Sequence, residues 1–381
     1  MGKTVWALKN ETTATTFTSI VQGFDVMIGR RNYLDDYDGQ ILSIQIINDS
    51  DQISGFTLND EISLKSGSFF NQIFFVQGVS FQDSPGNTGL STATIQCSDW
   101  LARAGRVQAN NLSLTVGASG TQLQAFESTS GGPLPSSMTV LPFAGFGDSD
   151  CSAATYSGSV ATRVQLNLTT EKGLMFYDGT ILKPMARSSV DNWTAPYDFS
   201  YETPATNIVY QTFERMQNGL NMMNFVQVSP EGLTTQTAQE TTSLTTYGQN
   251  GYSLSTVDFS NSQGLDLASW LANTQSDPTD LRYTIGFSDA AQDATNLGLF
   301  VANISGPFGY LRTSNISYQI QKRTGAPISP QSEAVVMEGV QITATPNETL
   351  FQVFFSPLTL YQFFILNSST VGILNTSRLG W

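Results

Sequence analysis

The chain has 381 residues, of which 13% are charged, and its 31 acidic and 17 basic residues give a formal net charge of −14. Ordinary soluble domains carry about 25% charged residues, so we expect a surface built largely from neutral side chains that form hydrogen bonds. The acidic excess is spread along the chain. It argues against a protein that grips nucleic acid, because phosphate binding needs clustered Lys and Arg.

Histidine is absent, which removes the commonest general base and the commonest transition-metal ligand. Without histidine, Cys97 and Cys151 cannot form a zinc site of the usual kind. The alternating run around Cys97 favours a buried free thiol, although spacing does not decide whether the two cysteines pair. The sequence also has no P-loop and no Gly-x-Gly-x-x-Gly motif. We therefore expect a structural building block and not an enzyme, with no catalytic residue, cofactor or metal site.

No membrane segment is expected. Residues 1–6 lack the apolar stretch of a signal peptide, and no run reaches the roughly 18 apolar residues that span a bilayer. The sequence by itself predicts synthesis in a cytoplasm without membrane insertion.

The densest acidic clusters are Asp35-Asp36-Tyr37-Asp38-Gly39 and Asp148-Ser149-Asp150. Two carboxylates that converge in space could serve a glycosidase, but nothing in the sequence singles out such a pair. Asp36-x-Asp38-Gly39 is faintly similar to a calcium loop, without the later bidentate Glu. Solvated turns are the favoured interpretation of both clusters, with ion binding and catalysis as the alternatives.

The first section, residues 1–109, is predicted to be a small antiparallel barrel or sandwich. Apolar and polar residues alternate over 42–46 and 92–97, which is typical of half-buried strands. Residues 73–76 form a short apolar run. Ser98 or Asp99 can cap a short helix over 100–104.

The middle section, residues 110–204, begins with a stretch from 110 to 160 in which we expect little regular structure, because Gly and Pro interrupt any periodicity. Two apolar runs, 174–177 and 180–182, then flank Asp178-Gly179. This dipeptide between such runs is a strong hairpin signal.

The last section, residues 205–381, returns to strands, with a short helix over 265–273 that ends before Asp277-Pro278. The expected strands cover residues 225–228, 283–287, 297–301, 335–342, 351–355 and 363–366.

One internal similarity links the first and last sections. The run 74–81 resembles 335–342, with Gly78 and Gly339 in equivalent positions 261 residues apart. We predict two copies of one hairpin, in which each glycine forms a β-bulge where a side chain would not fit. Gly78, Gly339 and the pair Asp178-Gly179 are the residues that mark the fold. Chance similarity between two ordinary hairpins is the alternative.

Several segments in order resemble minor tail proteins of long-tailed bacteriophages, the tail hub or baseplate-hub-like family of the tail tip. They are Ile28–Ile44, Phe75–Val79, Ser91–Asp99, Thr170–Gly179 with Arg187, and Thr370–Trp381. Each segment alone is mostly turn and strand chemistry, and residues 110–160 and the low charge do not match the family.

The resemblance implies a mainly β fold with a few short helices. It would consist of a tube-like antiparallel β-barrel domain (1–109), an inserted middle domain (110–204), and a second tube-like barrel domain with a C-terminal tail segment (205–381). It also implies a homotrimer at the distal end of the tail, whose six barrels match the sixfold tail tube. Such a ring would contact the tail tube, distal tail protein, tape measure and tip or fibre proteins. Phage DNA would pass through it without specific binding, helped by acidic lumen walls.

Two other functions remain open. A distal tail or receptor-binding protein would grip host surface glycans with exposed aromatic residues, for which Tyr33, Tyr37 and Trp193 are the candidates. A tail-associated glycan hydrolase would need two converging carboxylates. A cellular surface β protein is disfavoured because no signal peptide is present.

Overall fold

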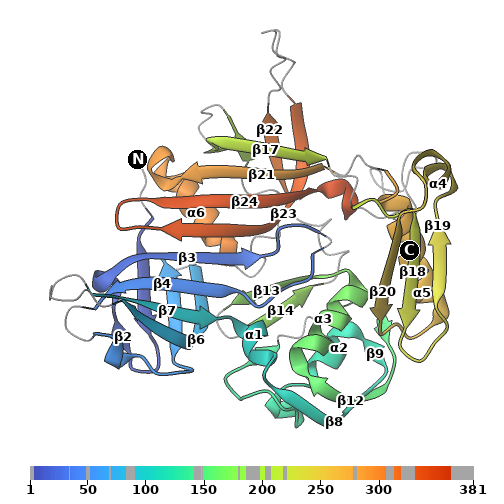
Figure 1. Ribbon diagram of the computed structural model, residues 1–381, viewed down its shortest axis with the longest axis horizontal. Helices are drawn as coiled ribbons and strands as arrows, with labels where there is room; N and C mark the ends of the chain where they lie inside the picture. Colours follow the sequence, from blue (N-terminus) through green and yellow to red (C-terminus); the bar gives the residue numbers. More distant parts are fainter. Residues whose placement is uncertain are drawn as a thin grey trace.

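The structure is a computed structural model, and it confirms a mainly β fold with a few helices, built on a large antiparallel sheet (Figure 1). The described residues are 4–33, 35–48, 52–67, 70–82, 91–140, 147, 149–178, 181–185, 198–201, 207–217, 221–277, 281–305, 313–318 and 331–361.

The main sheet has 14 strands and contains the same five-stranded unit twice. The first repeat consists of β3 (Val21–Gly29), β4 (Ile41–Ile47), β5 (Glu61–Ser66), β6 (Phe70–Gln82) and β7 (Thr92–Ser98). The second repeat consists of β17 (Thr212–Gln217), β21 (Leu281–Ser288), β22 (Thr313–Tyr318), β23 (Gln331–Ala344) and β24 (Thr349–Pro357).

The two repeats have identical topology. The first has the antiparallel order β3-β4-β7-β6-β5. The second has the antiparallel order β17-β21-β24-β23-β22. The internal similarity seen in the sequence therefore extends beyond one hairpin to a whole five-stranded unit.

The hairpins β6–β7 and β23–β24 share one irregularity. In the first, Val76 pairs with Cys97 and Gly78 with Gln96, so the ladder shifts register by one residue. In the second, the same shift lies between Met337 and Gly339. Each hairpin thus carries a bulge next to its glycine, at positions 261 residues apart.

We predicted that neither bulge has room for a side chain at its glycine, and this is true of only one of the two. A Cβ atom on Gly339 would lie 2.5 Å from the Arg30 carbonyl oxygen, so a side chain does not fit there. A Cβ atom on Gly78 would meet nothing within 4 Å. The prediction of steric exclusion at Gly78 is wrong, because no atom of the described residues lies close enough to meet a side chain there.

The repeats are joined edge to edge rather than folded as two closed barrels. Strand β3 pairs with β4 on one side and with β23 on the other. Among the described strands, neither repeat closes on itself. The expected pair of closed barrels is therefore replaced by one continuous sheet, since the edge of β3 is occupied by the other repeat.

Short strands extend both ends of the sheet. Strands β1 (Trp6–Asn10) and β2 (Thr15–Thr16) continue it beyond β5. Strands β15 (Asp198–Ser200) and β16 (Asn207–Val209) continue it beyond β22 in parallel. The 3₁₀ helices are η1 (Thr18–Ile20), η2 (Gln52–Gly55), η3 (Ser128–Ser130), η6 (Asp289–Ala291) and η7 (Leu358–Leu360).

The middle section has more regular structure than its sequence predicts. Its elements are β8 (Gln108–Leu114), β9 (Gly117–Ala118), α2 (Ser119–Gln124), β10 (Thr139–Val140), β11 (Asp150–Cys151), β12 (Ala154–Ser159), α3 (Val160–Glu171), β13 (Leu174–Asp178) and β14 (Ile181–Met185). The expectation of little structure over 110–160 is wrong. The ladder between β8 and β12 is half-exposed and bulged, so the period-two pattern that marks a strand is weak there.

The expected hairpin in the middle section is present. Strands β13 and β14 are antiparallel, and Asp178 pairs with Ile181. Gly179 itself lies outside the described residues.

A second unit is inserted between β17 and β21. It consists of β18 (Phe225–Pro230), β19 (Gln236–Gln239), α4 (Thr241–Tyr247), β20 (Gly251–Thr256) and α5 (Asn261–Thr274), and its strands form their own three-stranded sheet. It packs against α3: Arg163 forms a 2.7 Å ion pair with Glu231, and Val257 N donates to Thr170 Oγ1. Part of the expected third domain thus contacts the middle section directly.

The expected helices are confirmed, and one expected strand is wrong. Helix α1 (Trp100–Ala104) begins after Asp99, whose carboxylate accepts from Ala102 N. Residues 297–301 form part of helix α6 (Ala294–Ser305) instead of a strand. Leu297, Phe300, Val301 and Ile304 are buried at helical spacing. The expected strand 363–366 lies outside the described residues.

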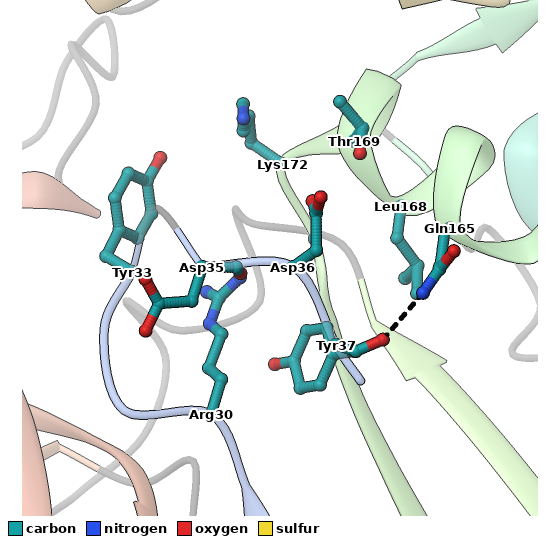
Figure 2. Close-up of a pocket in the computed structure, with 10 residues that line it drawn as sticks. Arg30, Tyr33, Asp35, Asp36, Tyr37, Gln165, Leu168, Thr169 and Lys172 are labelled. Carbon is teal, nitrogen blue, oxygen red and sulfur yellow. Dashed lines mark hydrogen bonds between the residues drawn. The ribbon is translucent and has the colours of Figure 1, made fainter. Parts of the chain in front are cut away.

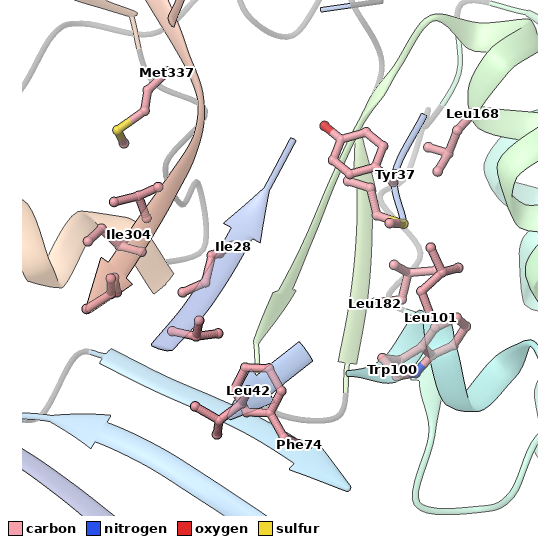
Figure 3. Packing of buried hydrophobic residues seen from close by; sticks show 14 of the residues in the cluster. Ile28, Tyr37, Leu42, Phe74, Trp100, Leu101, Leu168, Leu182, Ile304 and Met337 are labelled. Carbon is pink, nitrogen blue, oxygen red and sulfur yellow. The ribbon is translucent and has the colours of Figure 1, made fainter. Parts of the chain in front are cut away.

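One hydrophobic core runs through both repeats and the middle section. Figure 3 shows it from Met337 on β23, past Ile28 on β3 and Leu42 on β4, to Trp100 on α1 and Leu168 on α3. The joint between the repeats is therefore part of the core.

Candidate assembly interface

The joint between the repeats, where β3 meets β23, combines strand pairing with a buried polar site. Their antiparallel register runs from Gly29 opposite Gly339 to Phe24 opposite Ala344. Val26 and Ile342 are directly paired and both fully buried. Backbone pairing thus holds six residues of each strand, and apolar burial adds to it at alternate positions.

The other face of the joint carries a hydrogen-bonded cluster around Asp25. Its Oδ2 accepts from Thr343 Oγ1 at 2.6 Å and from Gln341 Nε2 at 3.2 Å. Hydrogen bonds to a carboxylate are stronger than those between neutral groups. The cluster therefore fixes the register as well as adding stability.

A buried ion pair closes the joint at the bulge. Glu338 is the extra residue of the bulge and is fully buried, and Arg30 Nε donates to its Oε2 at 2.9 Å. Arg30 also donates to the Tyr361 hydroxyl at 3.1 Å, and that hydroxyl donates to Glu338 Oε1. The bulge thus places the Glu338 side chain against the Arg30 guanidinium, which neutralises its charge.

Tyr361 and Tyr37, which lie beside Arg30, remain neutral because their pKa values are raised. Burial raises the pKa of Tyr361, and the negative charge of the neighbouring Glu338 carboxylate raises it further. Burial also raises the pKa of Tyr37. The Arg30 guanidinium carbon lies 4.8 Å from the Tyr37 ring centre and 5.5 Å from that of Tyr33, so aromatic faces shield the charge where water is excluded.

A small cavity of about 20 Å³ adjoins this cluster, between the 30–37 loop and α3 (Figure 2). Gln165 Nε2 donates to the Tyr37 carbonyl oxygen across it at 2.8 Å. The cavity has room for about one water molecule, which is too little for a substrate.

A larger groove of about 800 Å³ lies at the far end of the joint. Residues that line it include Trp6 from β1, Phe24 and Ile47 from the first repeat, and Ala344 and Pro346 from the second. Its described lining holds no charged side chain. It therefore does not provide the paired carboxylates that a glycan hydrolase needs.

The acidic and aromatic candidates that the structure describes do not come together as a binding site. Within the described ranges, no group of three or more Asp, Glu and Cys residues could hold a metal ion. Tyr33 and Tyr37 are buried, at 2% and 3% exposed, and do not offer a glycan platform. Asp148 and Trp193 lie outside the described residues. Cys97 and Cys151 are both free and buried.

The residues chosen from sequence to mark the fold lie at separate places. Gly78 and Gly339 lie in equivalent bulges, and three strands, β3, β4 and β7, separate β6 from β23 in the sheet. Asp178 ends β13 in the middle section. Arg30 lies in a segment that resembles the tail family, and Glu338 lies in the repeated run 335–342. Neither pattern predicted that the two residues pair. No sequence signal pointed to Tyr361.

No helix in the described parts of the chain has the length and apolar character that a membrane crossing requires.

Comparison with solved structures shows the fold. The chain resembles the tail protein from Neisseria meningitidis MC58 with a TM-score of 0.61 and 8% sequence identity, covering 94% of this chain and 98% of that one. It also resembles the 43 kDa tail protein of prophage MuSo2 from Shewanella oneidensis, with a TM-score of 0.58, 8% identity and the same coverage of both chains. No protein-family model matches the sequence, and a search of curated proteins finds no significant match. The chain therefore has the fold of phage tail proteins along nearly its whole length.

Proposed function

We propose that this chain is a structural subunit of a phage tail, a tail hub at the distal end that forms a ring between the tail tube and the tip. The observation that carries the proposal is the duplicated five-stranded unit within one chain. Three chains would present six such units and so match a sixfold tube. The likeness to tail proteins over nearly the full length supports the same role.

In this role the function is geometric. Each repeat is one segment of a tube-like wall, and the barrel character expected from the sequence belongs to the assembled ring rather than to a single repeat. The ring would contact the tail tube, the distal tail protein, the tape measure and the tip or fibre proteins. It would stay sealed before infection and then let DNA pass.

A structural role also accounts for the chemistry of the joint. Arg30 and Glu338 neutralise each other inside the core. The larger groove has no charged lining among its described residues. These features suit a rigid wall element better than an enzyme or a glycan-binding module, for which no exposed aromatic cluster is found at Tyr33 and Tyr37.

Two measurements test the proposal. Electron microscopy of virions that carry a tagged copy of this protein should place the tag at the distal end of the tail. Native mass spectrometry of the purified protein and chemical cross-linking in the virion should both give a trimer. A tag on the capsid or along the tail shaft, or a monomer in both samples, would overturn the proposal.

A further inference from the structure

The second repeat shows how a strand edge of this unit is covered. On one side of β23, strand β22 pairs with its first residues, up to Val336. Strand β3 pairs with its last residues, Gly339 to Ala344, on the same side. One edge of β23 is thus covered by two strands in succession. Strand β22 pairs with the part before the bulge, and β3 pairs with the part after it.

The first repeat lacks the second of these partners. Strand β5 pairs with the first residues of β6, up to Phe75. Beyond the bulge, residues Gly78 to Gln82 pair with β7 on the other side. No strand in the described part of the chain pairs with their remaining edge.

Exposure differs accordingly between equivalent residues. Phe81 is 60% exposed, whereas its equivalent in the second repeat, Ile342, is fully buried. An exposed aromatic residue on an unpaired edge strand is a template for another strand.

The strand equivalent to β3 is β17, and no described strand pairs with its second edge either. In the first repeat Val26 pairs with Leu42, and Leu42 with Cys97. In the second, Arg215 pairs with Tyr283, and Tyr283 with Phe355. Because Cys97 and Phe355 are equivalent residues of the two hairpins, Arg215 is equivalent to Val26.

The sequences of these two strands agree with this alignment. Phe24-Asp25-Val26-Met27 in β3 corresponds to Phe213-Glu214-Arg215-Met216 in β17. Within the described structure β17 pairs only with β21, and Met216 is 44% exposed.

We propose that β17 of one copy of this chain adds to the open edge of β6 in the next copy, as β3 adds to β23 within the chain. This proposal rests on the ring proposed above and names its interface. The register follows from the internal joint: Ser80 lies opposite Met216, Phe81 opposite Arg215, and Gln82 opposite Glu214.

Side-chain chemistry is conserved between the internal joint and the proposed one. Inside the chain, Asp25 accepts hydrogen bonds from Gln341 and Thr343. The equivalent residues are Glu214 in one copy and Ser80 and Gln82 in the next. A carboxylate therefore again faces two side chains that can donate.

The contact is heterologous, because each copy contributes β17 to one neighbour and β6 to the other. Such contacts form closed rings when the rotation between copies closes, and open filaments when it does not. Because the internal and external joints use equivalent strands, each step around the ring passes from one repeat to the next in the same way. Three chains then give six equivalent steps.

Disulfide trapping tests the register. The double variant Ser80→Cys/Met216→Cys places two thiols opposite each other, at the roughly 4.5–5.5 Å Cα separation of paired strands, which a disulfide spans. Mild oxidation should give a covalent trimer on a non-reducing gel. The native Cys97 and Cys151 are buried and should not cross-link.

The matched control is Ser80→Cys/Thr212→Cys, which moves one thiol four residues, about 13 Å, along β17. It should give no covalent trimer. Each single variant should give none either.

A charge exchange tests the side chains. Glu214→Lys should dissociate the oligomer at least tenfold more readily, and adding Gln82→Glu should restore assembly. Both substituted positions are exposed, so circular dichroism should show an unchanged fold.

The outcomes separate this proposal from the ring itself. If the protein is trimeric but Ser80→Cys/Met216→Cys does not cross-link, the strand assignment is overturned and the hub proposal stands. If the protein is monomeric both in solution and in the virion, the hub proposal fails and this interface fails with it.

Discussion

The hairpins β6–β7 and β23–β24 have the same register and the same bulge, yet their outer edges differ. In β23 the edge is covered by β3, and the bulge residue Glu338 is fully buried against Arg30. In β6 the corresponding bulge residue is Gln77, which is half-buried and donates to Phe75 O of its own strand.

The difference shows that the hairpin itself does not determine what covers its edge. The duplicated unit has one edge paired inside the chain, whereas no described strand pairs with the equivalent edge. Edge strands left open tend to pair with other chains.

The largest effect is expected at the bulge residues. Glu338→Ala leaves the buried Arg30 charge without its partner, and the loss of one member of a buried ion pair costs about 3–5 kcal/mol. The equivalent change Gln77→Ala should cost less than about 1 kcal/mol, because no charge is stranded. Urea unfolding followed by circular dichroism measures both, and equal losses would contradict the comparison.

The next effect concerns the apolar residues that follow the bulges. Ile342→Ala removes a fully buried side chain and should lower the free energy of unfolding by about 2–5 kcal/mol. Phe81→Ala removes an exposed side chain and should leave monomer stability nearly unchanged while it weakens assembly. Unfolding curves and sedimentation velocity distinguish the two. A loss of monomer stability at Phe81 as large as that at Ile342 would count against an open edge.

The glycines of the two bulges should respond in opposite ways to alanine. Gly339→Ala places a Cβ atom 2.5 Å from the Arg30 carbonyl oxygen, and such overpacking costs about 1–3 kcal/mol. Gly78→Ala meets no atom within 4 Å and should be neutral or slightly stabilising. Thermal unfolding of both variants gives the answer, and a destabilised Gly78→Ala would show a neighbour at that edge.

The smallest effect is expected in the unit inserted between β17 and β21 of the second repeat, where the buried Asp258 should make stability depend on pH. Burial raises the pKa of Asp258 to about 6, against a hydrogen bond from Thr256 that lowers it. Between about pH 4 and pH 6 the folded state keeps this proton while the unfolded state has released it, so stability should fall as pH rises through this window.

Asp258→Asn should remove that part of the pH dependence, at most about 2 kcal/mol. Thermal midpoints of both proteins at pH 4.5 and pH 7 provide the measurement. Parallel pH profiles of the two proteins would show that Asp258 does not titrate in this range.

Local patterns predicted local elements well. Helix α1 follows from Asp99 as its cap, and the hairpin β13–β14 follows from two apolar runs around Asp-Gly. The strand expected over 297–301 failed, because a short apolar run fits a buried helix as well as a strand. Helix α3 was missed because its buried face carries Arg163, Asn167 and Glu171, which hide the apolar stripe.

The candidate site was less accessible from the sequence. The similarity around Gly78 and Gly339 pointed to the repeat, and the likeness of Phe24–Met27 to Phe213–Met216 could have extended it. The pairing of Arg30 with Glu338 joins residues 308 positions apart, and no local pattern encodes such a contact.

The sequence by itself determined the β-rich character, the duplicated hairpin with its glycine, and the absence of histidine chemistry, because these depend on composition and short-range periodicity. Only the tertiary structure decided that β3 lies against β23, that Glu338 is buried while Gln77 is half-buried, and that no described strand pairs with the edge at Phe81. The physical reason is that a strand carries the same pattern whichever partner covers its edge, so the partner is set by the packing of the whole chain.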